Sequence, residues 1–382
     1  MRFDGTQIQN EIYLSGESPW PVGADDWEAR AAAQLDAGPF GYIAGGAGAE
    51  ATIRANREAF ERRRLRPRML GGHTERRLGV DVLGTPSPFP FFLAPVGVLS
   101  IAHGDGELAP ARAAAAARVP FILSTAASHS IEEIADAMGD ARRWFQLYWV
   151  SDREVVESLV RRAEAANYGA IVVTLDTLVL GWRPRDLRNA YLPFREGEGI
   201  AHFTSDPVFR SRLPVEDDPL VAAGTMLAMF PNLALRWDDL AWLRELTSLP
   251  LLVKGVLTAE DAERALAAGV DGIVVSNHGG RQVDGAVASL DALVEIRAAV
   301  GGEAVVLVDS GIRSGADVVK AMALGADAVL VGRLYVYALA VGGEAGVAAL
   351  IGQLAAETDL TLALMGAPSI TELDSTWIAA SR

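Results

Sequence analysis

From residue 88 onward, short apolar runs rich in β-branched and aromatic residues alternate with longer Ala-rich segments of helical period. This alternation is typical of repeated βα units, whose strands form a parallel sheet. The apolar runs begin at Phe89, Phe121, Trp144, Ala170, Leu251, Gly272, Val305 and Ala328. These eight consecutive units predict an α/β fold in which the sheet closes into a (β/α)8 barrel, the TIM barrel.

The helical segments between the runs carry start and stop signals. Ser130 and Thr258 each precede a helical segment and have an acidic residue three positions later, as at a capped helix N-terminus. Ser151 is expected to cap the helix that follows it. Gly269 and Gly325 stand where two of the helices should end, because glycine adopts the left-handed conformation that closes helices.

Some parts of the chain do not follow the repeat. Two helices are predicted before the barrel, near residues 26–35 and 52–63, and a long segment with prolines and charges interrupts the fourth βα connection. Connections of that length are usually lids or disordered loops. We predict a single domain of residues 1–382 with an N-terminal extension (1–87), a barrel (88–341) with a lid near 190–218, and C-terminal helices (342–382).

Polar and reactive residues follow the predicted strands at their carboxyl ends, where barrel enzymes build their active sites. In chain order these ends carry Ala94 to Gly97, Ser124, Gln146 with Tyr148, Thr174 with Asp176, Lys254, Ser276 with His278 and Arg281, Asp309 with Arg313, and Gly332 with Arg333. Because strand ends converge at one face of a barrel, we expect these side chains to form one site.

The last two strand ends predict a phosphate site. The segments DSGIRSG (309–315) and LVGR (330–333) follow the seventh and eighth strands, where barrels commonly bind phosphate. Their glycines let backbone N–H groups approach an anion, and Arg313 and Arg333 add positive charge. Ser314 could begin the next helix with its positive end toward the ligand.

The sixth strand end predicts acid–base chemistry. His278 is followed by two glycines that leave its ring accessible, and Arg281 comes three residues after it as a clamp for a carboxylate. Asp176, on another strand end, could orient the imidazole. Lys254 ends an otherwise apolar strand and is expensive to bury without an anionic partner, such as a reduced flavin.

Composition narrows the possible partners. The chain has 382 residues, half of them hydrophobic, a net charge of −15 and no cysteine, so nucleic acid and anionic lipid are unexpected partners and thiol chemistry is excluded. The other histidines lack metal-ligand spacing, and we expect no metal. The N-terminus lacks the features of a secretory signal, and the longest apolar stretch (89–102) is shorter than the roughly 18 residues of a membrane span. We therefore expect a cytoplasmic protein with no membrane association.

Four motifs carry a resemblance to a known family. SNHGGRQ (276–282), DSGIRSG, QLYW (146–149) and TLDT (174–177) resemble the FMN-dependent 2-hydroxy acid oxidases and dehydrogenases. The likeness covers nearly the whole chain and includes GYIAGGAG around Tyr42. LGWRPRD (180–186) is most similar to lactate 2-monooxygenases, while lactate oxidases and glycolate oxidases are also similar.

The resemblance implies roles for individual residues. FMN would contact Ala94, Pro95, Val96, Gly97, Ser124, Gln146, Thr174, Lys254, Ser276, Asp309, Gly311, Arg313, Gly332 and Arg333. Substrate would contact Tyr42, Tyr148, Arg183, His278 and Arg281, and the catalytic set would be His278, Asp176, Tyr148 and Arg281. His278 would take a proton while two electrons pass to FMN, and hydride and carbanion routes remain open. The family also implies a homotetramer or homo-octamer.

The implied reaction is oxidation of a small L-2-hydroxy acid such as L-lactate by O2, with decarboxylation to acetate, CO2 and water as in lactate 2-monooxygenase. Ala126 stands where glycolate oxidases have tryptophan, which should widen the pocket for larger substrates. Gly97 replaces an alanine of many oxidases and should leave more space beside the flavin. We expect this space, together with retention of the keto acid and H2O2 behind the lid, to favour the monooxygenase reaction.

Other readings remain open. An oxidase would release the keto acid and H2O2, on bulkier substrates if the pocket is wide, and a dehydrogenase would pass electrons to another acceptor. A non-redox phosphate-binding barrel would explain the loops at 309–315 and 330–333 but not His278 with Arg281. A non-catalytic flavin-binding protein would leave the acid–base set unexplained.

Overall fold

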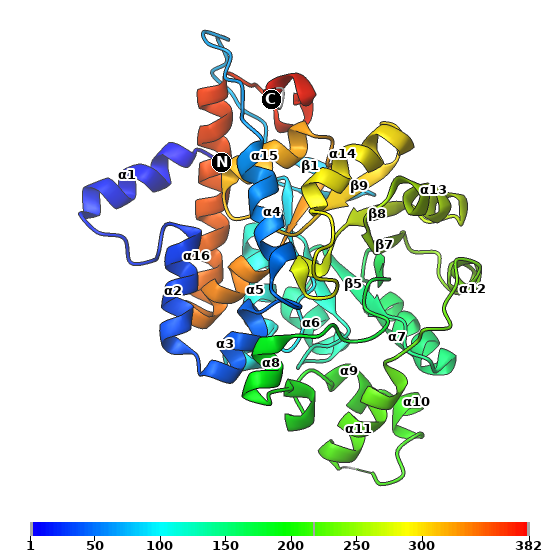
Figure 1. Cartoon of the computed structure of the whole chain (residues 1–382). Coiled ribbons are helices and arrows are strands. Elements are labelled where there is room, and N and C mark those ends of the chain that lie inside the picture. Colours follow the sequence, from blue (N-terminus) through cyan, green and yellow to red (C-terminus); the bar gives the residue numbers. More distant parts are fainter. Residues whose placement is uncertain (1–2, 217, 380–382) are drawn as a thin grey trace.

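The computed structural model describes residues 3–216 and 218–379, which fold around a closed barrel of parallel strands (Figure 1). The strands are β3 (Phe91–Leu93), β4 (Phe121–Ser124), β5 (Arg143–Tyr148), β6 (Ile171–Thr174), β7 (Leu251–Val256), β8 (Gly272–Val275), β9 (Val305–Val308) and β10 (Ala328–Val331). They pair in chain order, and β10 pairs with β3 to close the ring. Each predicted apolar run overlaps one of these strands, so the predicted TIM barrel is confirmed.

Helices cover the outside of the barrel. The main ones are α5 (Leu108–Ala117), α6 (Ile131–Met138), α7 (Arg153–Ala165), α12 (Asp239–Leu246), α13 (Ala259–Ala267), α14 (Ser289–Val300), α15 (Gly315–Ala323) and α16 (Arg333–Met365). Ser130 forms the predicted capping box with Glu133, and Thr258 caps α13. Gly269 and Gly325 follow α13 and α15 with positive φ, as predicted.

One predicted cap is wrong. The Ser151 hydroxyl donates to the carbonyl of Met229 instead of capping α7. Asp152 is the N-cap, and its carboxylate accepts hydrogen bonds from the backbone N–H groups of Glu154 and Val155. Both residues are good cap formers, and the contact of Ser151 with a distant segment decides between them.

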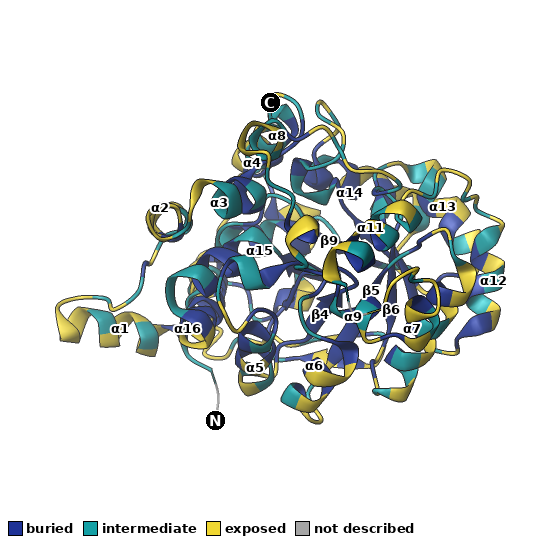
Figure 2. Ribbon diagram, turned by 90° about the horizontal axis from the view of Figure 1, so that it is seen from below, coloured by how far each residue is buried: buried dark blue, intermediate teal, exposed yellow. Residues whose placement is uncertain are grey.

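The N-terminal extension contains four helices and a hairpin. The helices are α1 (Gly5–Ser15), α2 (Ala24–Gln34), α3 (Ala37–Ala44) and α4 (Ala51–Arg62), and the hairpin pairs β1 (Val80–Val82) with β2 (Thr85–Ser87). The two predicted helices are α2 and α4, whereas α1, which lies beside α16 in Figure 2, and α3 were not predicted. Val82 packs with Phe92, Ile122 and Trp144 inside the barrel, so the hairpin closes the amino end of the strands.

The segment inserted after β6 is folded into short helices. These are α8 (Pro184–Asn189), η2 (Pro193–Glu196), α9 (Ala201–Thr204), α10 (Pro207–Arg210) and α11 (Pro219–Met229). His202 is fully buried, with its Nε2 3.0 Å from the carbonyl oxygen of Ser124. The described part of the predicted lid therefore packs against a strand end and is not a disordered loop.

The last barrel helix continues far beyond the barrel. α16 spans 33 residues and kinks at Gly342 and Gly343, and the 3-10 turns η4 (Ile370–Glu372) and η5 (Ser375–Trp377) follow it. In the described part of the chain, α16 alone is long and apolar enough to cross a membrane, with a mean hydropathy of 1.7 over its most apolar window. That window is 61% buried within the protein, where α16 packs against α2, α5 and α15, as a core helix does.

Candidate active site

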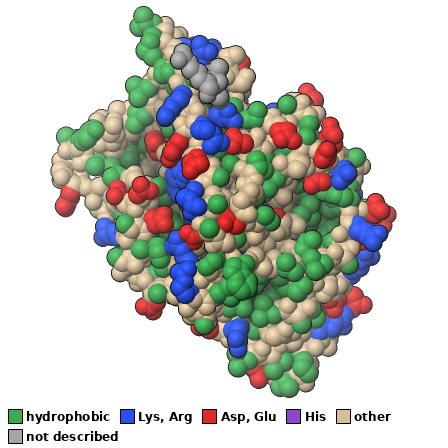
Figure 3. Space-filling view, viewed as in Figure 1, with side chains coloured by type: hydrophobic (Ala, Val, Ile, Leu, Met, Phe, Trp, Pro, Cys, Tyr) green, Lys and Arg blue, Asp and Glu red, His purple; other side chains and the backbone are tan. Residues whose placement is uncertain are grey.

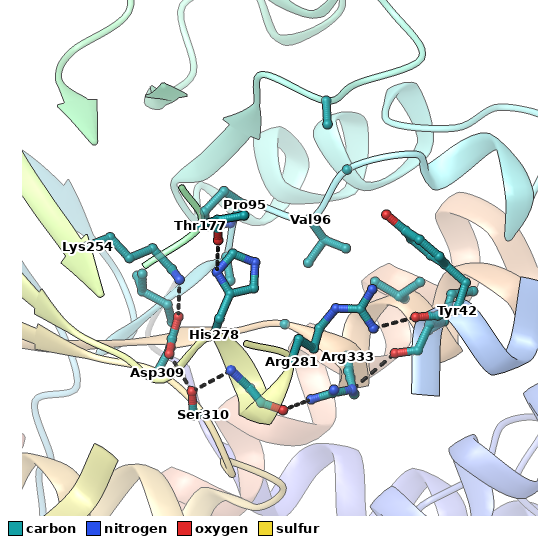
Figure 4. Close-up of a pocket in the computed structure, with 18 of the residues that line it drawn as sticks. Tyr42, Pro95, Val96, Thr177, Lys254, His278, Arg281, Asp309, Ser310 and Arg333 are labelled. Atoms are coloured by element: carbon teal, nitrogen blue, oxygen red, sulfur yellow. Dashed lines mark hydrogen bonds and ion pairs between the residues drawn. The ribbon is translucent and has the colours of Figure 1, made fainter. Parts of the chain in front are cut away.

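The carboxyl ends of the strands surround a cavity with about 1080 Å³ of space not filled by atoms, including its open mouth (Figure 4). The predicted site residues that line it are Tyr42, Ala94, Pro95, Val96, Gly97, Tyr148, Arg183, Lys254, His278, Arg281, Asp309, Gly311, Arg313, Gly332 and Arg333. The barrel thus brings most of the predicted side chains into one cavity.

The other five predicted residues lie beneath the lining. The Ser124 hydroxyl donates to Gln146 Oε1 at 3.0 Å, and Gln146 Nε2 donates to Thr174 Oγ1 at 2.9 Å. Ser276 Oγ accepts a hydrogen bond from Lys254 at 2.9 Å. Asp176 contacts His278, as described next. These residues form a buried polar layer across neighbouring strand ends instead of part of the cavity wall.

His278 is held by two residues of the loop after β6. Its Nδ1 lies 2.8 Å from Asp176 Oδ1 and 3.1 Å from Thr177 Oγ1. A carboxylate only accepts hydrogen bonds, so Nδ1 carries the hydrogen and Nε2 keeps its lone pair. Nε2 lies 3.5 Å from the hydroxyl oxygen of Tyr148. The ring therefore has the tautomer of a base.

The charges around His278 favour a neutral ring beside an ionised carboxylate. Burial lowers the pKa of the His278 imidazole below its usual range, although Asp176 opposes this shift. Burial would raise the pKa of Asp176, but His278 and Lys254 outweigh it and lower that pKa to about 2. Burial also raises the pKa of the Tyr148 hydroxyl. At neutral pH the group includes a proton acceptor, His278, and a fixed negative charge, Asp176.

Lys254 has an anionic partner within the protein. Its Nζ lies 3.3 Å from Asp309 Oδ2, and both side chains are almost fully buried. Burial would lower the pKa of Lys254, but Asp309 and Asp176 outweigh it and raise the pKa. The sequence predicted an anionic partner, of which a reduced flavin was one example, and the Asp309 carboxylate is such a partner within the protein.

Four arginines form a positive wall on the other side of the cavity. Arg281 donates to the carbonyls of Tyr42 and Gly45, and its guanidinium carbon lies 4.8 Å from the centre of the Tyr42 ring. Arg333 donates to three carbonyls, which belong to Ile43, Gly279 and Gly45. The side chains of Arg183 and Arg313 likewise donate only to uncharged oxygens. None of the four forms an ion pair with a carboxylate of the described residues.

The unpaired arginines are costly to keep charged. Burial, with a contribution from Arg183, lowers the pKa of Arg281 to about 9, and burial lowers that of Arg333 to about 10. Acidic and basic side chains are interspersed over the face of the molecule in Figure 3, and the net charge is −15. The positive field is therefore local to the cavity, where an anion would relieve the repulsion.

The start of α15 is not open to an anion. Ser314 caps this helix as predicted, but the N–H of Gly315 donates to Glu357 at 2.8 Å and that of Arg313 to Asp317 at 3.0 Å. The expectation that this helix end faces the ligand is therefore wrong. The N-terminus of α16 has no side-chain cap, and its first residues, Gly332 and Arg333, line the cavity.

Apolar side chains form the remaining wall of the cavity. Ala126 lies there with Phe194 and Phe230, which come from the segment inserted after β6. The extra space expected at Gly97 is absent, because a Cβ at this position would lie 2.8 Å from the Ala126 Cβ and 2.7 Å from its carbonyl oxygen. The small residue at 97 makes room for Ala126 and does not enlarge the cavity.

Several lining residues were not predicted. Thr177 belongs to the TLDT motif and directly follows Asp176, so its position was a usable signal. Phe194 and Phe230 lie in or near a long insertion without periodicity, where sequence gives no indication of which side chains face inward. Ser310 lines the cavity and donates to Asp309 at 2.7 Å.

Comparisons with known proteins agree with this geometry. The family model described as FMN-dependent dehydrogenase matches residues 31–380. An L-lactate oxidase of Nostoc sp. is 44% identical over 94% of this chain and 98% of the relative, and a 4-hydroxymandelate oxidase of Amycolatopsis orientalis is 46% identical over 87% and 90%. A crystal structure of mandelate oxidase superposes with a TM-score of 0.82 at 44% identity, over 92% of this chain and 96% of that one.

Proposed function

We propose a substrate class and a product outcome for a chain that belongs to the FMN-dependent dehydrogenase family and oxidises L-2-hydroxy acids with O2. Its substrates are 2-hydroxy acids with side chains larger than that of glycolate. Its products are a 2-keto acid and H2O2. The observation that carries this proposal is the cavity itself. It combines His278, two arginines for a carboxylate and an apolar wall in which the small Ala126 stands.

The residues present fit FMN. Arg313, Arg333 and the uncapped start of α16 offer positive charge and backbone N–H groups for the phosphate. Asp309, as a carboxylate, suits the ribityl hydroxyls and not the phosphate. Lys254 is buried in the carboxyl half of β7 and lines the cavity, where it would place its positive charge beside the flavin ring. FMN, when bound, supplies a two-electron acceptor.

The substrate carboxylate binds at Arg281 and Arg183. Arg281 is already fixed by two carbonyls and by stacking on Tyr42, so little side-chain entropy is lost when an anion binds. The carboxylate neutralises a wall that has no ion-pair partner among the described residues. His278 lies beside Arg281 in Figure 4, so a carboxylate bound at Arg281 places the hydroxyl-bearing carbon near this base.

His278 Nε2 accepts a proton from the substrate. The ring is neutral before the reaction because burial lowers its pKa. When it becomes an imidazolium, Asp176 and Thr177 hold Nδ1 and stabilise the new charge. Tyr148, whose hydroxyl remains protonated, can donate a hydrogen bond to the substrate oxygens. The substrate loses two electrons and two protons, and O2 gains the same to give H2O2.

Substrate size and product outcome follow from the apolar wall. Ala126, Phe194 and Phe230 contact the side chain and offer it no polar partner, which supports an apolar group. The names of the relatives, L-lactate oxidase and 4-hydroxymandelate oxidase, support an oxidase outcome. A Cβ at Gly97 would meet Ala126 and not open space, so Gly97 by itself gives no support to the decarboxylating reaction.

Product analysis tests this proposal. Purified holoenzyme is given L-lactate or L-mandelate in air, with catalase omitted. We expect one keto acid and one H2O2 for each O2 consumed, and higher kcat/KM for both substrates than for glycolate. Acetate and CO2 from lactate without H2O2 would instead establish the monooxygenase reaction, and a strong preference for glycolate would refute the substrate class.

A further inference from the structure

A buried pair of amides joins the N-terminal extension to the loop that carries His278. Asn56 lies on α4 and Asn277 directly precedes His278, and they are 2% and 4% exposed. Asn56 Nδ2 donates to Asn277 Oδ1 at 2.9 Å, and Asn277 Nδ2 donates to Asn56 Oδ1 at 2.7 Å. Two reciprocal hydrogen bonds fix the relative position of both side chains.

Further hydrogen bonds tie this pair to both ends of the loop. Asn56 Oδ1 also accepts from the N–H of Ser289 at 3.2 Å. Asn277 Oδ1 accepts from the N–H of Gly280 at 3.1 Å, and its Nδ2 donates to the carbonyl of Val287 at 3.1 Å. Every side-chain polar atom of the pair is bonded, so removing one partner would leave buried groups unsatisfied.

The loop needs such support because its backbone is unfavourable. His278, Gly279 and Gly280 have φ values of 57°, 65° and 74°. The left-handed region is natural for glycine but costs free energy for histidine, and it persists only where surrounding contacts impose it. Asn277 caps the turn formed by these residues, and Asn56 fixes Asn277.

We infer that Asn56 is a positioning residue, which holds His278 in its reactive orientation through Asn277. This inference rests on the proposed role of His278. Arg281, three residues further on, has independent anchors in the carbonyls of Tyr42 and Gly45. Loss of Asn56 should therefore misplace the base more than the carboxylate clamp.

The test compares three variants of the holoenzyme. Asn56→Leu removes both reciprocal hydrogen bonds at similar volume. Asn56→Asp keeps an acceptor for Ser289 and Asn277 but loses the donor, and serves if the leucine variant does not fold. Phe60→Leu is the control, because Phe60 is fully buried on α4 but does not line the cavity. Turnover, FMN content and amide hydrogen exchange of residues 277–284 are measured for each.

We expect Asn56→Leu to lower kcat roughly 10- to 100-fold through misplacement of the base, with a much smaller change in KM and retained FMN. Exchange across 277–284 should accelerate about tenfold or more as the loop opens locally. Asn56→Asp should show smaller changes, and Phe60→Leu should lose thermal stability with neither effect. Unchanged exchange in both Asn56 variants, or equal effects in Phe60→Leu, would overturn the inference. An inactive wild-type enzyme would refute the proposed function, while the exchange data would still decide whether Asn56 orders the loop.

Discussion

The two sides of the cavity treat buried charge differently. On one side, Asp176 holds His278, and Asp309 balances Lys254 at 3.3 Å. On the other side, the side chains of the four arginines of the positive wall donate to carbonyl and amide oxygens and form no hydrogen bond or ion pair with a carboxylate of the described residues. Both sides line the same cavity, so burial alone does not explain why one side has carboxylate partners and the other has none.

The difference lies in what balances the charges. The charges on the first side are balanced within the protein before any ligand binds, whereas those of the arginine wall are balanced only when an anionic ligand binds. The paired side fixes the tautomer and protonation state of the base within the protein alone. In the arginine wall, burial together with the neighbouring Arg183 lowers the pKa of Arg281 to about 9, although Asp186 opposes this shift, and a bound anion would relieve the repulsion. Substitutions on the paired side should therefore affect chemistry, whereas substitutions in the wall should affect binding.

The largest effect should come from the paired side. His278→Asn removes the base but keeps a polar side chain. We expect kcat/KM to fall by roughly 10² to 10⁴, the usual contribution of general acid–base catalysis. Steady-state turnover should show this loss while the visible spectrum shows normal FMN content. A loss below about tenfold would mean that another group takes the proton.

A substitution in the wall should weaken cofactor binding. Arg333→Met removes a guanidinium that lines the cavity, and a hydrogen bond to a charged group is worth about 1.5–3 kcal/mol. We expect the Kd of FMN to rise roughly 10- to 100-fold, with kcat largely restored at saturating FMN. Reconstitution followed by flavin fluorescence measures this. Arg188→Met, at an exposed position on α8, is the control. An equal rise in the Kd of FMN in this variant would contradict the claim that the arginines of the wall hold the cofactor.

The apolar wall should control substrate size. Ala126→Trp fills the space beside Phe194 and Phe230. We expect kcat/KM for L-mandelate to fall about tenfold or more, whereas that for glycolate changes by less than about threefold, because only the larger side chain needs the space. A matched series of substrates gives the ratio. Equal losses for both substrates would indicate damage to the cofactor site instead.

The smallest effect should appear in the pH dependence. The pKa of His278 is lowered from 6.5 by burial, so the base is neutral at pH 7 and becomes protonated only as the pH falls below this value. We expect kcat/KM to be level near neutrality and to decline on the acid side with a midpoint below 6.5. A midpoint above 6.5 would show that Asp176 dominates over burial.

The sequence predicts the barrel well because each strand is a short, largely buried run of aliphatic and aromatic residues. It also predicts His278, Arg281 and Arg333 in one cavity, since strand ends of a closed barrel must converge. The polar layer beneath the cavity is harder to predict from the sequence. Gln146 and Thr174 occur at the correct strand ends, but sequence position alone does not show whether a side chain faces the cavity or its neighbour.

Features that depend on contacts between distant segments were missed. Glu357 blocks the start of α15 from a position 42 residues away, and Asn56 reaches Asn277 across 221 residues. The helical period of α4 was recognised, but its buried asparagine gave no local signal. Ser151 is predicted as a cap, but the local rule is satisfied equally well by Asp152, which is the N-cap in the structure. Such choices are settled by tertiary packing.

The central claim is that the cavity positions a 2-hydroxy acid for oxidation by FMN with His278 as the base. Anaerobic mixing of the holoenzyme with L-mandelate or L-lactate tests it most directly, with His278→Asn measured in parallel. We predict rapid bleaching of the flavin absorbance in the wild type, slowed by roughly 10² or more in the variant. A flavin that stays oxidised with both acids, or equal bleaching rates in the two proteins, would contradict the claim.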